Sequence, residues 1–162
     1  MTTDPLAPVS KTVTVRASVQ DTFTAFTEGF DGWWPRSHHI GSSPMKKAII
    51  ECRLNGACTS LQEDGTYCPW GTVTAWEPPH RFVFAWQITP DWKYQPDLAT
   101  ASEVEVRFIE EPDGRTRVEL EHRGFERMGA AGGAMRAGVD TPQGWNGLLH
   151  LFSQFAEGRA TS

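Results

Sequence analysis

Apolar and polar residues alternate through the central part of the chain, and this period of two is typical of strands with one buried face. The clearest examples are "SEVEVRFIE" at 102–110 and "RTRVELEHR" at 115–123, which the turn "EPDG" separates. The residues expected to face inward are Val104, Val106, Phe108, Val118, Leu120 and His122. The alternate positions are mostly Glu and Arg, so opposite charges across the strand pair support a solvent-exposed face. This pattern indicates an antiparallel sheet that is covered on one side only.

Five further segments have the composition of strands, because they are rich in β-branched and aromatic residues. They are "KTVTVRA" at 11–17, "KAIIECRL" at 47–54, "ACTSLQ" at 57–62, "YCPWGTVTAW" at 67–76 and "RFVFAWQI" at 81–88. The last segment places four apolar side chains on one face, namely Phe82, Phe84, Trp86 and Ile88. Pro69 and Gly71 indicate a sheet edge or a bulge. We expect Trp70 and Trp76 to face inward.

The dipeptide Asn55-Gly56 predicts a two-residue type I′ turn that joins the second and third of these segments into a hairpin. In that register Cys52 lies opposite Thr59, so Cys52 and Cys58 point to opposite faces of the sheet. The chain has three cysteines, and an odd count argues against a disulfide framework. We therefore expect three free thiols, with Cys52 in the core.

Helical spacing begins directly after the first strand. Apolar side chains at spacings of three and four form one face, namely Phe23, Phe26 and Phe30. Ser18 is the expected N-cap of this helix. Because Gly29 and Gly32 interrupt the pattern, we expect two short helices.

The C-terminal segment also has helical spacing. Its apolar stripe consists of Trp145, Leu148, Leu149, Phe152 and Phe155. Thr141 is the expected N-cap, Pro142 the first helical residue and Gly158 the stop. This is the one long helix predicted, so we expect it to cover the open face of the sheet. The glycine-rich segment at 128–138 predicts irregular backbone between sheet and helix.

Composition excludes several classes of protein. A length of 162 residues suits one domain, and we expect a disordered lead-in at 1–10 and a single domain at 11–159. A net charge of −5 disfavours a nucleic-acid partner. No apolar run of about 20 residues is present, so no membrane-spanning helix is expected. The N-terminal residues lack the basic start and the apolar stretch of a secretory signal, so we expect a cytoplasmic protein.

The order of these elements resembles the helix-grip (Bet v 1-like) fold of the START-like (SRPBCC) superfamily, in the branch of the activator of heat-shock-protein-90 ATPase homologues. The resemblance is carried by Trp33-Trp34 and by segments 50–86, 105–122 and 144–152. It implies an α+β fold in which a curved antiparallel sheet wraps around the long C-terminal helix. Relatives usually have a cavity between sheet and helix, which holds hydrophobic or amphipathic small molecules.

The segment "GWWPRSHHIG" at 32–41 has four interpretations. A metal site needs three or four converging ligands, which adjacent His38 and His39 rarely supply, so we expect neither a metal nor another cofactor. A catalytic site would use one histidine as a base, but no nucleophile motif accompanies it. As a pocket rim, Trp33 and Trp34 would form the wall beside an arginine or a histidine that meets an anionic group. In the last interpretation both tryptophans fill the core.

His122 is the other polar candidate, because alternation places it inward, where it needs a hydrogen-bond partner. It is either a satisfied core histidine or a donor that orients a ligand. The residues expected to bind a ligand are Trp33, Trp34, His38, Trp70, Phe84, Trp86, Val106, Phe108, His122, Trp145 and Leu149. The loop at 89–100 carries Trp92 and Tyr94, which would form a lid, an anchor for the loop or a dimer contact.

Three functions stay open at this point. The first, which we favour, is the binding of a small hydrophobic or amphipathic molecule in the cavity, by a monomer or a homodimer. The second is a chaperone-associated module of the stress response, which would bind a chaperone or another protein through an exposed surface. The third is an enzyme of the cyclase or dehydratase type. It ranks last because it needs two polar groups converging in the cavity, and only His122 and His38 are candidates.

Overall fold

The computed structural model describes residues 6–36, 38, 43–89, 91, 93–141 and 144–160, without the side chains of the last two. Its strands are β1 (Val9–Val15), β2 (Met45–Ile50), β3 (Ala57–Gln62), β4 (Tyr67–Glu77), β5 (Arg81–Trp86), β6 (Ser102–Glu111) and β7 (Arg115–Arg123). Its helices are α1 (Val19–Thr27), α2 (Phe30–Trp33), α3 (Gly132–Val139) and α4 (Trp145–Ala160). Short 3₁₀ helices are η1 (Leu98–Thr100), η2 (Pro112–Gly114) and η3 (Phe125–Ala131).

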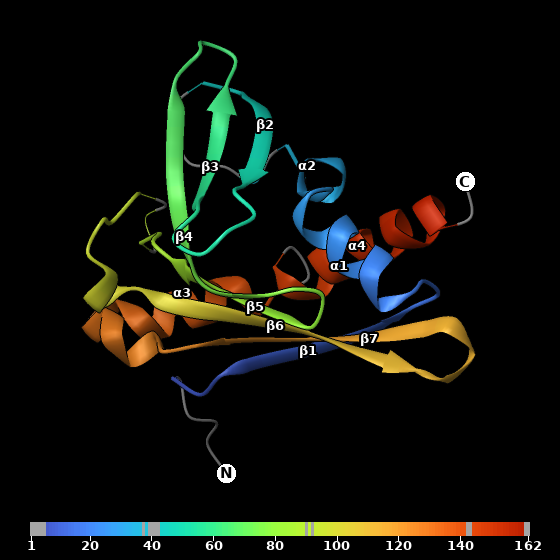
Figure 1. Ribbon diagram of the computed structural model, residues 1–162. Helices are drawn as coiled ribbons and strands as arrows, with labels where there is room; N and C mark the ends of the chain where they lie inside the picture. The colour runs from blue at the N-terminus through green and yellow to red at the C-terminus, as the bar shows by residue number, and fades with distance from the viewer. Residues whose placement is uncertain are drawn as a thin grey trace.

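The seven strands form one antiparallel sheet in the order β1-β7-β6-β5-β4-β3-β2. The sheet curls strongly, and α1, α2 and α4 lie on its concave side (Figure 1). The α+β helix-grip fold is therefore confirmed, with two short helices after the first strand and the long helix against the sheet.

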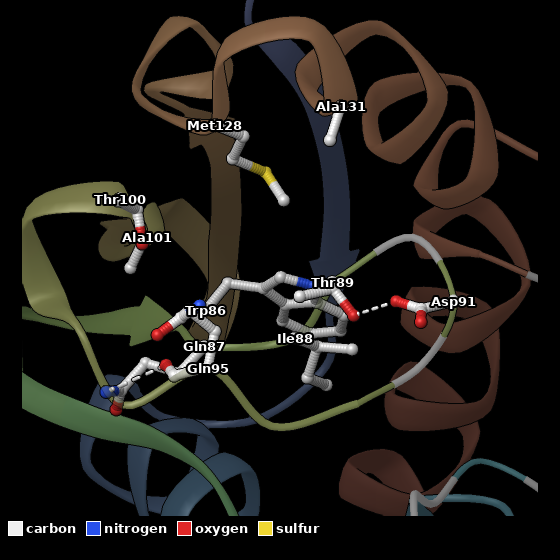
Figure 2. Close-up of a pocket in the computed structure, with 10 residues that line it drawn as sticks. All are labelled: Trp86, Gln87, Ile88, Thr89, Asp91, Gln95, Thr100, Ala101, Met128 and Ala131. Atoms are coloured by element: carbon white, nitrogen blue, oxygen red, sulfur yellow. Dashed lines mark hydrogen bonds between the residues drawn. The ribbon is translucent and has the colours of Figure 1, made fainter.

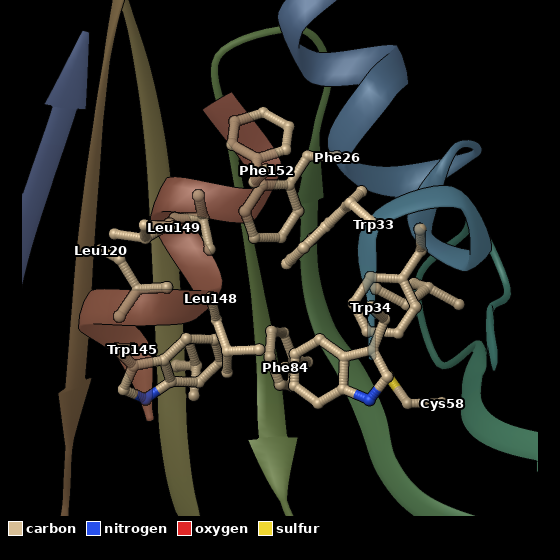
Figure 3. Packing of buried hydrophobic residues seen from close by; sticks show 14 of the residues in the cluster. Phe26, Trp33, Trp34, Cys58, Phe84, Leu120, Trp145, Leu148, Leu149 and Phe152 are labelled. Carbon is tan, nitrogen blue, oxygen red and sulfur yellow. The ribbon is translucent and has the colours of Figure 1, made fainter. Parts of the chain in front are cut away.

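The space between sheet and α4 is filled by large apolar side chains (Figure 3). The helix contributes four residues that are at most 4 % exposed, namely Trp145, Leu148, Leu149 and Phe152. The six inward-facing residues predicted for β6 and β7 are at most 1 % exposed, so the predicted alternation is correct. The rings of Phe26 and Phe152 have centroids 4.8 Å apart, which joins α1 to α4. Each such buried side chain stabilises the fold by about 1.5–3 kcal/mol.

Two bulges or irregularities interrupt the pairing of β4, the strand in which Pro69 and Gly71 indicated a sheet edge or a bulge. The first lies around Trp70, and the second lies between Val73 and Ala75. A bulge adds one residue and so reverses the face on which the following side chains lie. Because the two reversals cancel, Trp70 and Trp76 both pack on the inward side, as expected.

The hairpin between β2 and β3 is present, but the predicted two-residue turn is wrong. Ile50 pairs with Cys58, and residues 51–56 form a longer loop. In this loop Asn55 donates its backbone N–H to a carbonyl of β4 at 2.8 Å, so the loop pairs with β4 instead of extending β2. The assignment of Cys52 to the core is therefore also wrong.

The three cysteines are free thiols, as expected, and they differ in burial. Cys58 is the cysteine that lies fully in the core, and burial raises the pKa of its thiol. Cys52 and Cys68 are half-buried, and partial burial also raises the pKa of each thiol.

The glycine-rich segment at 128–138 forms part of η3 and α3. The predicted irregular backbone is confirmed at Gly129, where η3 is kinked with a φ of 63° and a ψ of −133°, whereas the residues from Gly132 to Val139 form the helix α3. Met135 and Val139 of α3 are 1 % and 4 % exposed. At Gly132 a Cβ atom would lie 2.1 Å from the carbonyl oxygen of Phe125. This glycine is therefore required by close backbone approach in an ordered element.

The N-terminal elements begin close to their predicted positions. β1 begins at Val9, so the expected lead-in at 1–10 overlaps it, while residues 1–5 lie outside the described part of the chain. Ser18 caps α1 as predicted, because its hydroxyl accepts a hydrogen bond from the backbone N–H of Asp21 at 3.1 Å.

The C-terminal helix lies about three residues later than predicted, because it begins at Trp145, so Thr141 is not its N-cap. It continues through Gly158 to Ala160. An isolated glycine costs a helix only about 1 kcal/mol relative to alanine, which is too little to end a well-packed helix. Pro142 lies outside the described residues. Within the part of the chain that the structure describes, no helix is both long and apolar enough to cross a membrane.

The convex face of the sheet carries the charge pairs that the alternation predicted. Arg123 reaches Glu103 at 2.9 Å and Glu105 at 2.6 Å, and Arg81 also pairs with Glu105. Glu105 is 7 % exposed although it faces away from the helices. Burial opposes its ionisation, but hydrogen bonds from Arg81 and Arg123 outweigh burial and hold the pKa of this carboxyl below its ordinary value. Glu105 is therefore ionised, and the charged side chains around it on this face pair with one another.

Candidate ligand-binding pocket

A pocket of about 330 Å³ opens at one end of the sheet, where β5 ends and the chain enters the segment at 87–101. Its lining is mostly apolar and consists of Trp86, Gln87, Ile88, Thr89, Asp91, Gln95, Thr100, Ala101, Met128 and Ala131. Figure 2 shows Met128 and Ala131 of η3 across the pocket from Trp86 and Ile88. The volume lies at the lower end of the range for small-molecule sites. The arrangement suits a small, largely apolar molecule.

Gln87 holds the loop that forms one side of the pocket. Its side-chain Oε1 accepts a hydrogen bond from Thr72 at 2.7 Å, and its Nε2 donates to the carbonyl of Pro96 at 3.1 Å. Ile88 and Tyr94 form an isolated β-bridge within the same loop. The lid, anchor or dimer contact suggested for Trp92 lies outside the described residues. The described part of the loop is fixed to β4 and to itself.

The rim of the pocket carries one negative charge. Thr89 donates its hydroxyl to the carboxylate of Asp91, and this hydrogen bond lowers the pKa of the carboxyl. Lys93 lies 3.7 Å from the same carboxylate. Asp91 is the one charged residue among the ten that line the pocket. Because Lys93 balances the charge of Asp91 and the described lining holds no other charged side chain, the pocket suits an uncharged ligand.

Most residues expected to bind a ligand lie in the packed core instead of at this pocket. Trp86 lines it, whereas nine others are core residues that the pocket does not include, namely Trp33, Trp34, Trp70, Phe84, Val106, Phe108, His122, Trp145 and Leu149. Ring contacts join many of them. The rings of Trp34 and Trp70, for example, are stacked, with centroids 5.9 Å apart and an angle of 5° between their planes.

The segment "GWWPRSHHIG" is tied to the core and to β2. Trp34 donates its indole N–H to the backbone carbonyl of His38 at 2.8 Å. Arg36 lies 2.7 Å from Asp31, whose carboxylate also accepts the backbone N–H of Ala48 at 2.8 Å. Arg36 is therefore paired with a residue of the preceding helix α2 and does not line the pocket. His39 lies outside the described residues, and among the described ones no three His, Cys, Asp or Glu side chains gather as metal ligands would.

His122 is fully buried, and both of its ring nitrogens have partners. Trp145 donates its indole N–H to Nδ1 at 3.0 Å. Because an indole N–H can only donate, Nδ1 accepts, so Nε2 carries the proton and donates to the hydroxyl of Ser102 at 2.8 Å. Burial lowers the pKa of His122 to about 3. In this tautomer His122 cannot take a proton from Ser102, so the pair does not generate a serine nucleophile.

His122 should make the protein sensitive to mild acid. The pKa of this side chain is about 3 in the folded protein and about 6.5 in an unfolded chain. Between these values the unfolded state binds a proton that the folded state does not, so stability falls as the pH falls below about 6.5. We expect His122 to account for a loss of about 2 kcal/mol between pH 7 and pH 5, measured by urea denaturation.

Two substitutions separate His122 from the other histidines. His122→Gln should be less stable at pH 7 but should lose less stability on going to pH 5. His150→Gln alters an exposed histidine of α4 and should keep the pH dependence of the parent protein. Equal pH dependence in both variants would contradict the assignment.

Several pocket residues were missed by sequence reasoning, including Gln87, Thr100, Met128 and Ala131. They come from segments that are not adjacent in sequence. Gln87 occupies an outward position of the alternating segment 81–88, and the other three lie in segments without a regular apolar period. The one usable signal was the pair Trp92 and Tyr94 in the loop at 89–100, which suggested a lid, an anchor for the loop or a dimer contact.

Known proteins resemble this chain over almost its whole length. The family model described as Activator of Hsp90 ATPase homolog 1-like protein matches residues 16–157. Among curated proteins none matches the chain.

Three solved structures illustrate the similarity. An anthrahydroquino-Gama-pyrone synthase, Txn09, complexed with SUM, is 33 % identical, with 94 % of this chain and 99 % of that chain covered and a TM-score of 0.64. The self-sacrificing resistance protein CalC from Micromonospora echinospora is 26 % identical, with 98 % of this chain and 99 % of that chain covered and a TM-score of 0.67. An AHSA1-like protein from Aeromonas hydrophila is 18 % identical, with 96 % of each chain covered and a TM-score of 0.61, a likeness that concerns the fold alone.

Proposed function

Since the chain belongs to the Activator of Hsp90 ATPase homolog 1-like protein family, we propose that it binds a small, largely apolar molecule in the pocket at the end of β5. The observation that carries the proposal is the pocket itself, which combines the apolar side chains of Trp86, Ile88 and Met128 with a short polar rim. The names of two similar structures add support, because one is a synthase complexed with SUM and the other is a resistance protein.

The proposed site differs from the cavity expected between sheet and helix. Aromatic rings of α1, α2 and α4 fill that space, with Phe26 and Trp33 4.9 Å apart and Trp33 and Phe152 5.3 Å apart. Protein interiors packed in this way leave few voids larger than a water molecule. The ligand therefore binds at the end of the sheet, beside the core.

Ligand binding should raise the melting temperature. A molecule that binds only the folded state, present at 100 times its Kd, adds about 2.7 kcal/mol of stability. For a chain of this size that corresponds to about 5–10 °C. The experiment uses a panel of small aromatic ketones, hydrocarbons and acids, with tryptophan fluorescence as a second signal, because Trp86 lines the pocket.

A pocket-filling variant locates the site. Ala131→Leu adds a side chain at the pocket lining and should abolish the temperature shift. Ala130→Leu adds the same side chain at an exposed neighbour that is not part of the lining and should keep the shift. A shift that survives Ala131→Leu would place the ligand elsewhere. No saturable response across the panel would favour a surface that binds a chaperone or another protein.

An enzyme is a second candidate, because the 33 % identical relative is named a synthase. Histidine catalysis finds no support in the geometry, since His122 is neutral, fully buried and bonded at both nitrogens. Among the described residues that line the pocket, Asp91 is the one that carries a charge. Product formation in the reaction of the Txn09 synthase, lost in Asp91→Asn while ligand binding persists, would favour this candidate.

A further inference from the structure

Trp86 brings a buried hydrogen-bond donor without an acceptor to the wall of the pocket. Its side chain is 4 % exposed, and its Nε1 has no hydrogen-bond partner among the residues that the structure describes. Two other buried indoles are satisfied, because Trp34 donates to the carbonyl of His38 and Trp145 donates to Nδ1 of His122, whereas the buried Nε1 of Trp33 also lacks a partner but does not belong to the pocket lining. A buried indole N–H normally has a partner, since leaving it unpaired costs about 1–3 kcal/mol.

Rings of the core surround the rest of the Trp86 side chain. The ring centroids of Trp70, His122 and Trp145 lie 6.0, 5.3 and 5.8 Å from that of Trp86. None of these rings offers an acceptor, because indole nitrogens only donate and both nitrogens of His122 are already bonded. Trp86 also lines the pocket, where Met128 and Ala131 lie opposite it (Figure 2), so the pocket is the space beside this indole from which a bound molecule can bring an acceptor.

The other lining residues define the chemistry of the molecule that brings this acceptor. Ile88, Ala101, Met128 and Ala131 offer apolar surface, and a methionine thioether packs well against aromatic rings. The carboxylate of Asp91 at the rim is paired with Lys93, and the described lining residues include no lysine, arginine or histidine that could pair with an anionic ligand.

We propose that Trp86 Nε1 donates a hydrogen bond to a carbonyl oxygen of the ligand, and that the ligand is an uncharged aromatic ketone or quinone. This inference rests on the proposed function and deepens it, because it names the ligand class and the atom that recognises it. The aromatic rings lie against Ile88 and Met128, and the carbonyl points inward to the indole.

Three matched probes test the ligand class. 9-Fluorenone carries one carbonyl, fluorene has the same rings with a methylene in its place, and 9-fluorenone-4-carboxylate adds a negative charge. One hydrogen bond corresponds to about a 5- to 10-fold difference in Kd. The parent protein should therefore bind 9-fluorenone about 5- to 10-fold more tightly than fluorene, and the carboxylate more weakly than 9-fluorenone, measured by calorimetry.

Two Trp→Phe substitutions test the atom. Trp86→Phe removes the N–H group and should bind 9-fluorenone and fluorene equally. Trp33→Phe is the matched control, because Trp33 also has an unpartnered buried Nε1 but lies away from the pocket, between Phe26 and Phe152. The control should keep the preference for 9-fluorenone. A preference that persists in Trp86→Phe would overturn the proposal.

A spectroscopic test needs no variant and applies even if Trp86→Phe does not fold. In protein labelled with ¹⁵N at its indole nitrogens, 9-fluorenone should move one indole N–H signal downfield, and fluorene should not. If the parent protein binds both probes equally and no indole signal distinguishes them, this inference fails while the proposed function stands. If neither probe binds, both fail.

Discussion

Trp145→Ala should lower the free energy of unfolding by about 3–5 kcal/mol, the range measured for truncating a fully buried tryptophan. Trp145 is 1 % exposed, and its ring lies 5.8 Å from that of Trp86 and 6.2 Å from that of Trp34. Truncation leaves a cavity between α4 and the sheet. It also removes the donor to His122 Nδ1, which leaves a buried acceptor unsatisfied. Urea denaturation followed by circular dichroism at pH 7 measures the loss.

Leu151→Ala is the control for this substitution, because Leu151 belongs to the same helix and is 41 % exposed. It should change the free energy of unfolding by no more than about 0.5 kcal/mol. Similar losses in the two variants would mean that α4 does not present its Trp145 side to the sheet.

Gly132→Ala should destabilise the protein by about 3 kcal/mol, at the upper end of the range for overpacking. The added Cβ would lie 2.1 Å from a backbone oxygen and 2.9 Å from a backbone carbon of Phe125. Since neither atom can rotate away as a side chain can, the junction between η3 and α3 has to open. Thermal and urea denaturation both report this effect.

Gly138→Ala is the matched control, because it makes the same change in the same helix. No atom lies within 4 Å of the Cβ position at Gly138. Alanine is the better helix former, so this variant should be as stable as the parent protein or up to about 1 kcal/mol more stable. A loss of stability at Gly138 comparable to that at Gly132 would show that helix composition, and not close approach, governs this segment.

The sheet could be predicted because its two longest alternating segments have one fully apolar and one charged face. In β6 and β7 every predicted inward residue is buried. The β2–β3 hairpin was only partly predictable, because Asn55-Gly56 is a local turn signal, whereas the loop is fixed by a hydrogen bond to β4. The glycine-rich segment was also only partly predictable, because it is kinked at Gly129 but helical from Gly132 onward. Gly132 is set by the approach of Phe125, which sequence alone does not reveal.

The candidate site was less predictable than the fold. Alternation identifies residues that face inward, but it does not distinguish a packed interior from a cavity. Phe84 and Trp86 are on the same face of β5, yet Trp86, the last residue of the strand, is the one that lines the pocket. The opposite wall comes from η3, whose position depends on tertiary packing.

The hydrogen bond between Trp145 and His122 also selects one placement of α4 along the sheet. Hydrophobic contacts are non-directional, so an apolar helix face alone tolerates several offsets. A slide of one helical turn, about 5.4 Å, would leave the indole donor and the imidazole acceptor unpaired in an apolar interior. Each unpaired group would cost about 1–3 kcal/mol. This polar pair therefore contributes less to the depth of the native free-energy minimum than to its uniqueness, because it penalises the neighbouring minima in which the helix is out of register.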